Sequence, residues 1–242
     1  MPDQRWLVLR LEAPMAAFGG VVIDHVGITR DFPAASMLTG LFANALGWER
    51  TDREVHQALQ DRLVFAARWE REGDDVFTDT QNAQLAKIDR GWTTYGKPEG
   101  RDGASYGAPH RRRRDYHADA CMTVVLRLRT PGMAPDLDDL ATALDCPARP
   151  LFIGRKPCLP TTPLRYGEIE APSAYEALCR LPCEGFSGGW LRALWPTDEG
   201  PVDGEIVHRV VDLADLRNWR TGLHGGARRV VEGAVIPEKV AP

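Results

Sequence analysis

Three features of the 242-residue sequence predict an α+β fold. Strand-like segments with alternating apolar residues occur at residues 6–11, 62–70 and 121–129. Segments with apolar residues at helical spacing follow the first and the third of these strands. A brief apolar segment at residues 150–154 ends the series as a fourth strand. The order strand, helices, strand, strand, helix, strand is that of a ferredoxin-like fold.

The first 70 residues are predicted to contain one strand, two helices and a second strand. Leucines alternate along residues 6–11, and apolar residues recur at helical spacing through residues 35–47. Thr51, with Glu54 three residues later, predicts a capping box at the start of the second helix. The second strand, residues 62–70, is predicted to have one apolar face, formed by Leu63, Phe65, Ala67 and Trp69.

The periodic pattern is lost between about residues 72 and 117. This stretch is polar, glycine-rich and charged, and it is too long for an ordinary loop in a compact domain. We therefore interpret it as an insertion that is either functional or partly disordered. The third strand follows it, and residues 135–145 form a helix before the fourth strand.

Residues 155–242 are predicted to be rich in strands. The clearest strands are residues 189–195 and 204–213, and residues 228–236 form another. Residues 215–223 are predicted to form a short helix. We expect a ferredoxin-like domain at residues 1–154, with the insertion, and a small β-rich domain at residues 155–242.

Composition limits the function classes. The hydrophobic fraction of 43% supports one large core or two small ones, and no segment approaches the roughly 18 to 20 apolar residues that span a bilayer. The N-terminus is too charged for a signal peptide, and the five cysteines are odd in number and mostly scattered, as is typical of reduced thiols. We expect a cytoplasmic protein with no membrane partner, no metal and no cofactor.

Positive charge is concentrated locally although the formal net charge is −4. Residues 104–114 contain four consecutive arginines, one histidine and no acid, and residues 149–158 contain three basic residues and no acid. Such patches can bind a polyanion, because phosphate contacts depend on the local potential. Residues 121–129 contain no aromatic residue that could stack on RNA bases, so RNA would be bound by the loops and the insertion.

Four segments in order resemble one family. They are "LVLRLEAPMAAFGG", "FPAASMLTGLFANALG", "RRRDYHADACMTVVL" and "FIGRKPCLPTTPL", and "VVDLADLRNWRTGLHGGARRV" adds to them. They resemble the CasD branch of the Cas-five family, within the RAMP superfamily, from type I-E CRISPR Cascade complexes. The resemblance covers nearly the whole chain.

The resemblance implies a RAMP-type ferredoxin-like domain, a β-hairpin thumb inserted within it and a small C-terminal β domain. It implies a non-catalytic subunit that holds the 5′ handle of the CRISPR RNA and caps the backbone filament in antiviral defence. Its partners would be the RNA, the backbone, large and other Cascade subunits, and target DNA indirectly through the complex. Relatives carry a D-Y/F-H-T pattern early in the thumb, where this sequence has residues 79–84, "DTQNAQ", so that motif's contacts are not assigned here.

With this resemblance, local chemistry nominates eleven RNA-binding residues. They are Phe18, Gly19, Gly20, Arg30, Ser36, Arg112, Arg114, Tyr116, Gly154, Arg155 and Lys156. An arginine can fork onto a phosphate and a tyrosine can stack on a base. In an extended segment Arg112, Arg114 and Tyr116 would share one side, with Arg111 and Arg113 on the other.

Each nomination has a plain structural alternative. The arginine run can be a solvated charge run, and Phe18 can belong to the core beside a tight turn. Gly154, Arg155 and Lys156 can be a simple polar turn. Ser36 can cap the first helix, or that helix N-terminus can hold a phosphate.

A second function class stays open, that of a metal-independent ribonuclease. Tyr95, Lys97, His110 and His117 are residue types that can exchange a proton during cleavage at a 2′-hydroxyl, and a related type I-C branch processes RNA with such residues. We expect no cleavage, because these residues form no compact, clearly spaced set.

Overall fold

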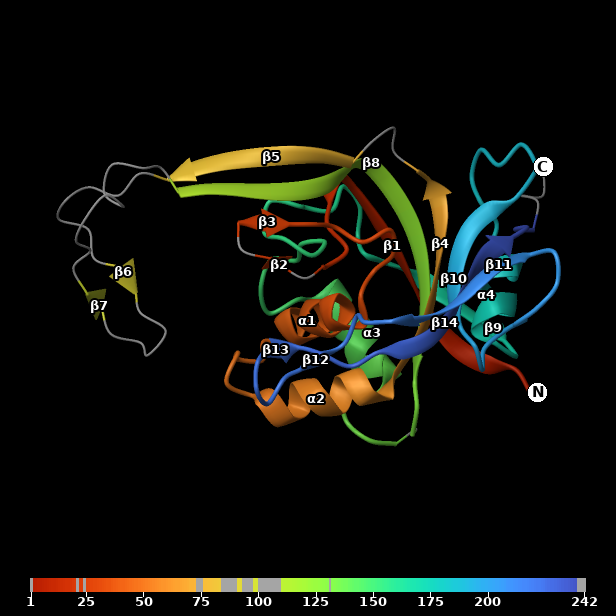
Figure 1. The fold of residues 1–242 in the computed structure, drawn as a ribbon. Coiled ribbons are helices and arrows are strands. Elements are labelled where there is room, and N and C mark those ends of the chain that lie inside the picture. Colours follow the sequence, from red (N-terminus) through yellow and green to blue (C-terminus); the bar gives the residue numbers. More distant parts are fainter. Residues whose placement is uncertain are drawn as a thin grey trace.

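The computed structural model describes residues 2–20, 22–23, 25–72, 76–83, 91–92, 98–99, 110–130 and 132–238. The helices are α1 (Ala35–Ala45), α2 (Arg53–Arg62), α3 (Leu137–Asp145) and α4 (Ala174–Arg180). The strands are β1 (Gln4–Ala16), β2 (Val22–Ile23), β3 (Val26–Gly27), β4 (Leu63–Arg71), β5 (Val76–Ala83), β6 (Gly91–Trp92), β7 (Pro98–Glu99), β8 (His110–Leu128), β9 (Arg165–Ala171), β10 (Leu191–Pro196), β11 (Val207–Leu213), β12 (Arg217–Asn218), β13 (Leu223–His224) and β14 (Arg228–Val235). Figure 1 shows a curved sheet with helices packed on it and a two-stranded ribbon that projects from its upper edge.

A large, mostly antiparallel sheet organises the chain. Its central strands lie in the order β4-β8-β1-β9, and each neighbouring pair is antiparallel. Helices α1 and α2 lie between β1 and β4 in the chain, and α3 lies between β8 and β9. The first three predicted strands and the helices predicted at residues 35–47 and 135–145 are therefore confirmed.

The predicted fourth strand at residues 150–154 is wrong. Its place beside β1 is taken by β9. Pro150 has no amide to donate and Gly154 has a positive φ of 83°, so the segment cannot continue a ladder. Ile153 is fully buried, and its backbone bonds to Ala17 and Cys158 instead. Its apolar character reflects a buried loop.

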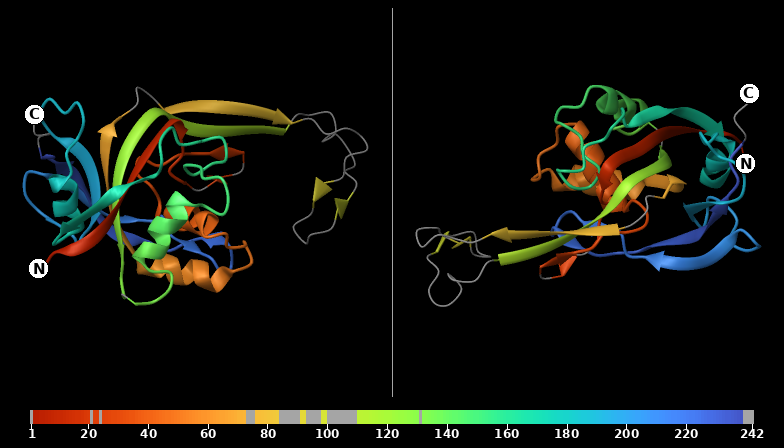
Figure 2. Two further views of the ribbon diagram at one scale, coloured as in Figure 1. Left: turned by 180° about the vertical axis from the view of Figure 1, so that it is seen from behind. Right: turned by 90° about the horizontal axis from the view of Figure 1, so that it is seen from above.

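Both faces of the sheet are buried. On one face Leu7, Leu9 and Leu11 of β1 belong to a core cluster that includes residues of α1, α2 and α3. On the other face Trp6 and Val8 pack in a second cluster with α4, β10 and β14. Helix α4, which the sequence analysis did not predict, covers this second face (Figure 2).

The helix starts differ from the prediction at one place. The N-cap of α2 is Asp52, whose side chain makes no capping hydrogen bond, so the predicted Thr51–Glu54 capping box is wrong. A capping box does start α3, where the Asp136 carboxylate accepts from the amide of Asp139 at 2.9 Å and the Asp139 carboxylate accepts from the amide of Asp136 at 2.9 Å. The sequence analysis did not predict this second capping box.

The C-terminal strands extend the same sheet in the order β4-β10-β14-β11. One sheet thus combines strands from both sides of residue 154. The predicted helix at residues 215–223 is wrong, because β12 and β13 form a hairpin there. The Gln60 side chain accepts from the amide of Arg217 at 3.1 Å and donates to its carbonyl at 2.9 Å, so these groups bond outside any helix.

The ribbon replaces part of the expected irregular insertion. Strand β5 pairs antiparallel with the first part of β8 over its whole length, from Val76 opposite His117 to Ala83 opposite His110. The loss of an apolar pattern over residues 72–117 therefore does not mean that regular structure is absent at 76–83 and 110–117. Periodicity did not reveal the ribbon, because both its faces are largely polar, and only the resemblance implied a hairpin in this segment.

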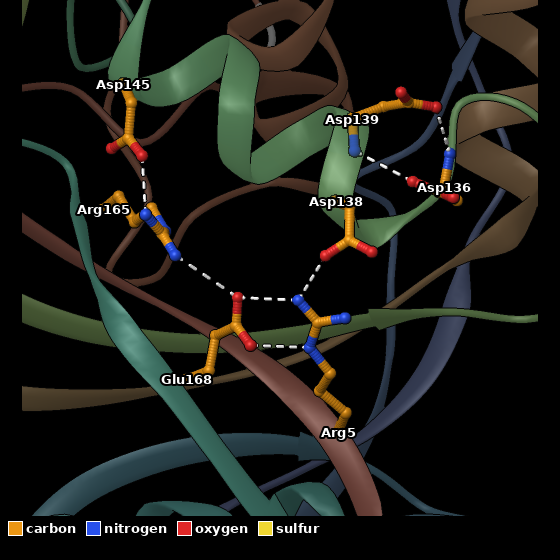
Figure 3. Close-up of polar contacts among 7 residues, drawn as sticks. All are labelled: Arg5, Asp136, Asp138, Asp139, Asp145, Arg165 and Glu168. Carbon is orange, nitrogen blue, oxygen red and sulfur yellow. Dashed lines mark hydrogen bonds and ion pairs between the residues drawn. The ribbon is translucent and has the colours of Figure 1, made fainter.

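An ionic network joins β1, α3 and β9 (Figure 3). Arg5 donates to both oxygens of Glu168, at 2.6 and 2.8 Å, and also to Asp138. Arg165 pairs with Asp145 at 2.6 Å and lies 3.4 Å from Glu168. Hydrogen bonds from Arg5 lower the pKa of Asp138 and of Glu168.

Candidate nucleic-acid interface

One face of the ribbon carries the side chains that the sequence analysis singled out. Residues directly opposite each other in an antiparallel pair place their side chains on the same face. The register therefore defines a surface that we call the ribbon face, which comprises Phe77, Asp79, Gln81, Arg112, Arg114 and Tyr116. The predicted strand register, in which Arg112, Arg114 and Tyr116 share one side, is confirmed.

The other face of the ribbon holds Arg111 and Arg113, both exposed. There Thr78 donates its hydroxyl to the Asp115 carboxylate at 2.7 Å. The amide of Arg113 donates to the carbonyl of His25 at 2.8 Å, which joins the ribbon to the short β2–β3 hairpin. The two arginine pairs therefore lie on opposite faces, and each face has one acid near its arginines, Asp115 on this face and Asp79, opposite Arg114, on the ribbon face.

Two aromatic rings pair at the root of the ribbon, and one of them is buried while the other is exposed. Tyr116 is 3% exposed and stacks on Phe77 with centroids 5.5 Å apart, while the Arg155 guanidinium lies 5.0 Å from its ring centroid. Covered in this way, Tyr116 cannot stack on a base, so that prediction is wrong for this arrangement. Phe77 is 38% exposed and presents the ring that Tyr116 supports. Sequence reasoning missed it, although it stands directly opposite Tyr116 once the strands are paired.

Arg155 and Lys156 have different environments. Arg155 donates to the carbonyls of Asp115 at 2.8 Å, Gly27 at 2.9 Å and Ile28 at 3.0 Å. It therefore fastens the ribbon root and the β2–β3 hairpin to its own turn. Lys156 is exposed, with its ammonium group available to a ligand.

Gly154 serves the fold rather than a ligand. A Cβ at this position would lie 1.7 Å from the carbonyl oxygen of Ala17, and φ is +83°. The predicted close approach is real, but the group that approaches is the chain's own backbone after β1.

The loop after β1 contains a core aromatic and two tight glycines. Phe18 is fully buried against Trp69, with ring centroids 5.7 Å apart, so its nomination as an RNA contact is wrong. Gly19 and Gly20 both have positive φ, and a Cβ on Gly20 would lie 2.7 Å from the carbonyl oxygen of Ile28. These glycines let the loop pass close to the β3–α1 connection beside the ribbon root.

The start of α1 is occupied by a carboxylate. The amide of Ala35 donates to Asp215 Oδ2 at 3.1 Å, and the amide of Ser36 donates to the Asp215 carbonyl at 3.1 Å. Ser36 makes no capping hydrogen bond, so both proposals for it, cap and phosphate site at the helix N-terminus, are wrong. Arg30 donates to the carbonyl of Ala214 at 2.5 Å and is half-buried.

The described histidine of the ribonuclease set is a core residue. His117 is 8% exposed, and its Nε2 lies 2.8 Å from the carbonyl oxygen of Arg30. Its ring packs on Phe18 and Trp69, at 5.1 and 5.3 Å between centroids. A general acid or base must reach the substrate, and this ring is covered. Tyr95, Lys97 and the His110 side chain lie outside the described residues.

The ribbon face and its root are electropositive. Arg112, Arg114 and Lys156 add three cations, whereas Asp79 is the one acid on this face among the residues that the structure describes, and Gln81 donates to it at 3.0 Å. Among the residues that the structure describes, no helix is long and apolar enough to cross a membrane. Among the same residues, no group of three or more His, Cys, Asp or Glu side chains could hold a metal ion.

Comparison with known proteins places this geometry in context. Residues 6–231 match the sequence model of a family described as CRISPR-associated protein (Cas_Cas5). The chain is 31% identical over 173 residues to the "CRISPR system Cascade subunit CasD" of Escherichia coli (strain K12), which covers 72% of this chain and 75% of that protein. Among solved structures, a chain of a "CRISPR RNA-guided surveillance complex" superimposes with a TM-score of 0.65 at 25% identity, covering 95% of this chain and 90% of that one. A "Crystal structure of Cas protein" gives a TM-score of 0.62 at 26% identity, covering 96% and 98%.

Proposed function

Because the chain belongs to the family of CRISPR-associated proteins matched over residues 6–231, we propose that it is a CRISPR RNA-binding subunit of a type I-E Cascade complex. In this role it holds the 5′ handle of the RNA, caps the backbone filament and contacts the large and other subunits, through which it meets target DNA indirectly. The curated relative named as a Cascade subunit and the superposition on a chain of an RNA-guided complex support this proposal.

The ribbon face is the observation that carries the RNA-binding part of the proposal. Arg112 and Arg114 share it, Lys156 lies at its root, and Phe77 presents an exposed ring beside them. Guanidinium groups fork onto phosphate oxygens, and an exposed aromatic ring stacks on any unpaired base. Arg155 acts as a positioning residue, since its donors are used by three carbonyls.

We also propose that the ribbon is a RAMP-type thumb on a ferredoxin-like domain, with a small β domain after residue 154. The strand order β4-β8-β1-β9 and the antiparallel ribbon support the first part. Under this division β9 of the second segment returns to pair with β1 of the first. The cover over His117 supports a role without RNA cleavage.

The salt dependence of RNA binding tests the ribbon face. We expect the paired replacement Arg112→Ala with Arg114→Ala to flatten the log–log salt slope for single-stranded handle RNA by about 1 to 1.5, since each lost phosphate contact is worth about 0.7. The matched control, Arg111→Ala with Arg113→Ala, removes the same charge from the other face and should leave the slope nearly unchanged. Equal effects of the two pairs would show that general charge, and not the ribbon face, binds the RNA.

A further inference from the structure

A second group of basic side chains lies around the β12–β13 hairpin, below the ribbon in Figure 1. We call it the Arg30 cluster, and it comprises Arg30, Arg217, His224 and Arg228. Arg217 belongs to β12, His224 to β13, and Arg228 begins β14. In Figures 1 and 2 the β12–β13 hairpin lies on the same side of the core as the ribbon and β2–β3.

The positive charges in the cluster act on one another. Burial, followed by the charges of Arg217 and Arg30, lowers the pKa of His224 below its usual value. Burial is also the main cause of the lowered pKa of Arg228, to which Arg30 adds. The carboxylate within the group, Asp215, already accepts twice from Arg228 Nε, at 3.2 and 2.9 Å. The cluster therefore keeps an excess of positive charge.

The guanidinium groups also have hydrogen-bonding capacity to spare. Each carries five N–H donors. Among the described residues, Arg30 places a side-chain donor only on the Ala214 carbonyl, and Arg217 only on the Gly222 carbonyl at 2.9 Å. The Nε atoms of both, and Nη2 of Arg228, are shielded from solvent and have no acceptor in this part of the chain. Guanidinium donors with an excess of positive charge are the chemistry that recognises a phosphate.

We propose that Arg30, Arg217 and His224 form a second phosphate-binding site, separate from the ribbon face, for a phosphodiester of the same single-stranded RNA. This inference rests on the proposed function for the identity of the RNA. Arg30 connects the two regions, because its carbonyl oxygen lies 2.8 Å from Nε2 of His117 at the ribbon root and its guanidinium donates to the Ala214 carbonyl just before β12. An RNA backbone that leaves the ribbon root can thus continue past Arg30 toward β13.

His224→Glu tests the site with little risk to the fold, because His224 is exposed. The new carboxylate would lie beside Arg30 and Arg217, where it stabilises the cluster and repels a phosphate. Leu223→Glu is the matched control, since Leu223 is the neighbouring residue, is 70% exposed and, in a strand, points to the other side. Both variants change one residue of the same hairpin to glutamate.

Two measurements on the full chain decide the question. Inorganic phosphate, added at constant ionic strength, should raise the Tm of the wild type and of Leu223→Glu but not of His224→Glu. The salt slope for single-stranded handle RNA should flatten by about 0.7 in His224→Glu and stay unchanged in Leu223→Glu.

The outcomes separate this inference from the proposed function. If RNA binding depends on Arg112 and Arg114 while both glutamate variants match the wild type in both measurements, the second site is refuted and the function stands. If phosphate stabilises the chain through His224 but the RNA slope does not respond, the assignment of the site to RNA is overturned. If no RNA binds at all, the proposed function fails, and the phosphate measurement alone judges the anion site.

Discussion

Arg155→Ala is expected to destabilise the folded protein, beyond any effect on RNA. The guanidinium donates to the carbonyls of Asp115, Gly27 and Ile28 at 2.8, 2.9 and 3.0 Å, and it covers the ring of Tyr116. These partners come from the ribbon root and the β2–β3 hairpin. Removing the side chain therefore leaves two projecting elements without their common attachment.

The magnitude follows from these contacts. Because Arg155 is only half-buried, each hydrogen bond is assigned a net value of about 1 kcal/mol rather than the larger value of a fully buried charged pair. Three such bonds, with about 0.5 to 1 kcal/mol for the cation–π contact, give a loss of about 3 to 4 kcal/mol in the free energy of unfolding. Lys156→Ala is the matched control and should change that free energy by less than about 0.5 kcal/mol, because the side chain is exposed.

Urea unfolding of the three proteins, followed by circular dichroism, measures these differences. We expect a lower midpoint for Arg155→Ala only. RNA affinity, measured in buffer where every variant is folded, should then weaken in Lys156→Ala through the loss of a direct contact. If Arg155→Ala unfolds within about 0.5 kcal/mol of the wild type, the positioning role assigned to this arginine is wrong.

Three further outcomes can be checked independently. Gly154→Ala should cost clearly more stability than Gly132→Ala, since both glycines have a φ of +83° but only Gly154 would place a Cβ against backbone; equal urea midpoints would mean that the dihedral alone matters. Arg5 lowers the pKa of Glu168, so the stabilisation from this ion pair is fully present above the unfolded-state pKa of about 4.3 and is lost as pH falls through the folded-state pKa. Glu168→Gln should therefore flatten the fall of the unfolding free energy at acid pH. An unchanged fall would contradict this. The purified chain should not cut repeat RNA in the absence of metal, because His117 is covered; cleavage that His117→Ala abolishes, seen on a denaturing gel, would overturn this expectation.

Strands and helices that bury one face were predictable from the sequence. The leucines of β1 and the apolar side of β4 alternate because those side chains enter the core beneath α1, α2 and α3. The leucines of α3 predict that helix for the same local reason. In each case the residues of the element alone are enough to predict its secondary structure.

The errors occurred where partners distant in sequence decide the structure. Residues 215–223 form a hairpin because Gln60, far away in the chain, takes the backbone groups of Arg217. Residues 150–154 are apolar because Ile153 is buried as a loop, which periodicity alone cannot distinguish from a strand. Both faces of the ribbon are largely polar, so its alternation carries no apolar signal.

In the candidate site, too, local geometry was predictable from the sequence, whereas contacts between distant residues were not. Strand alternation placed Arg112 and Arg114 on one face correctly, because it depends only on backbone geometry. Burial was not predictable, and it removes Tyr116 and Phe18 from the surface through contacts with Arg155 and Trp69. Those contacts join segments that the sequence separates by dozens of residues.

Because β8 is long, a small rotation at the root of the ribbon would move its far end through a larger distance. Strand β8 is 19 residues long, and its first eight residues pair with β5 while the rest pair with β1 and β4. At about 3.3 Å per residue these eight residues extend about 26 Å, so a rotation of about 10° at the root moves the far end by about 4.5 Å. The ladder is irregular near that root, where Asp119 has a φ of +45° and stands across from Pro14, which has no amide to donate. A rotation of this size would change the reach of Arg112, and the bonds from Arg71 to Asp119, from Arg155 to Asp115 and from Arg113 to His25 oppose it.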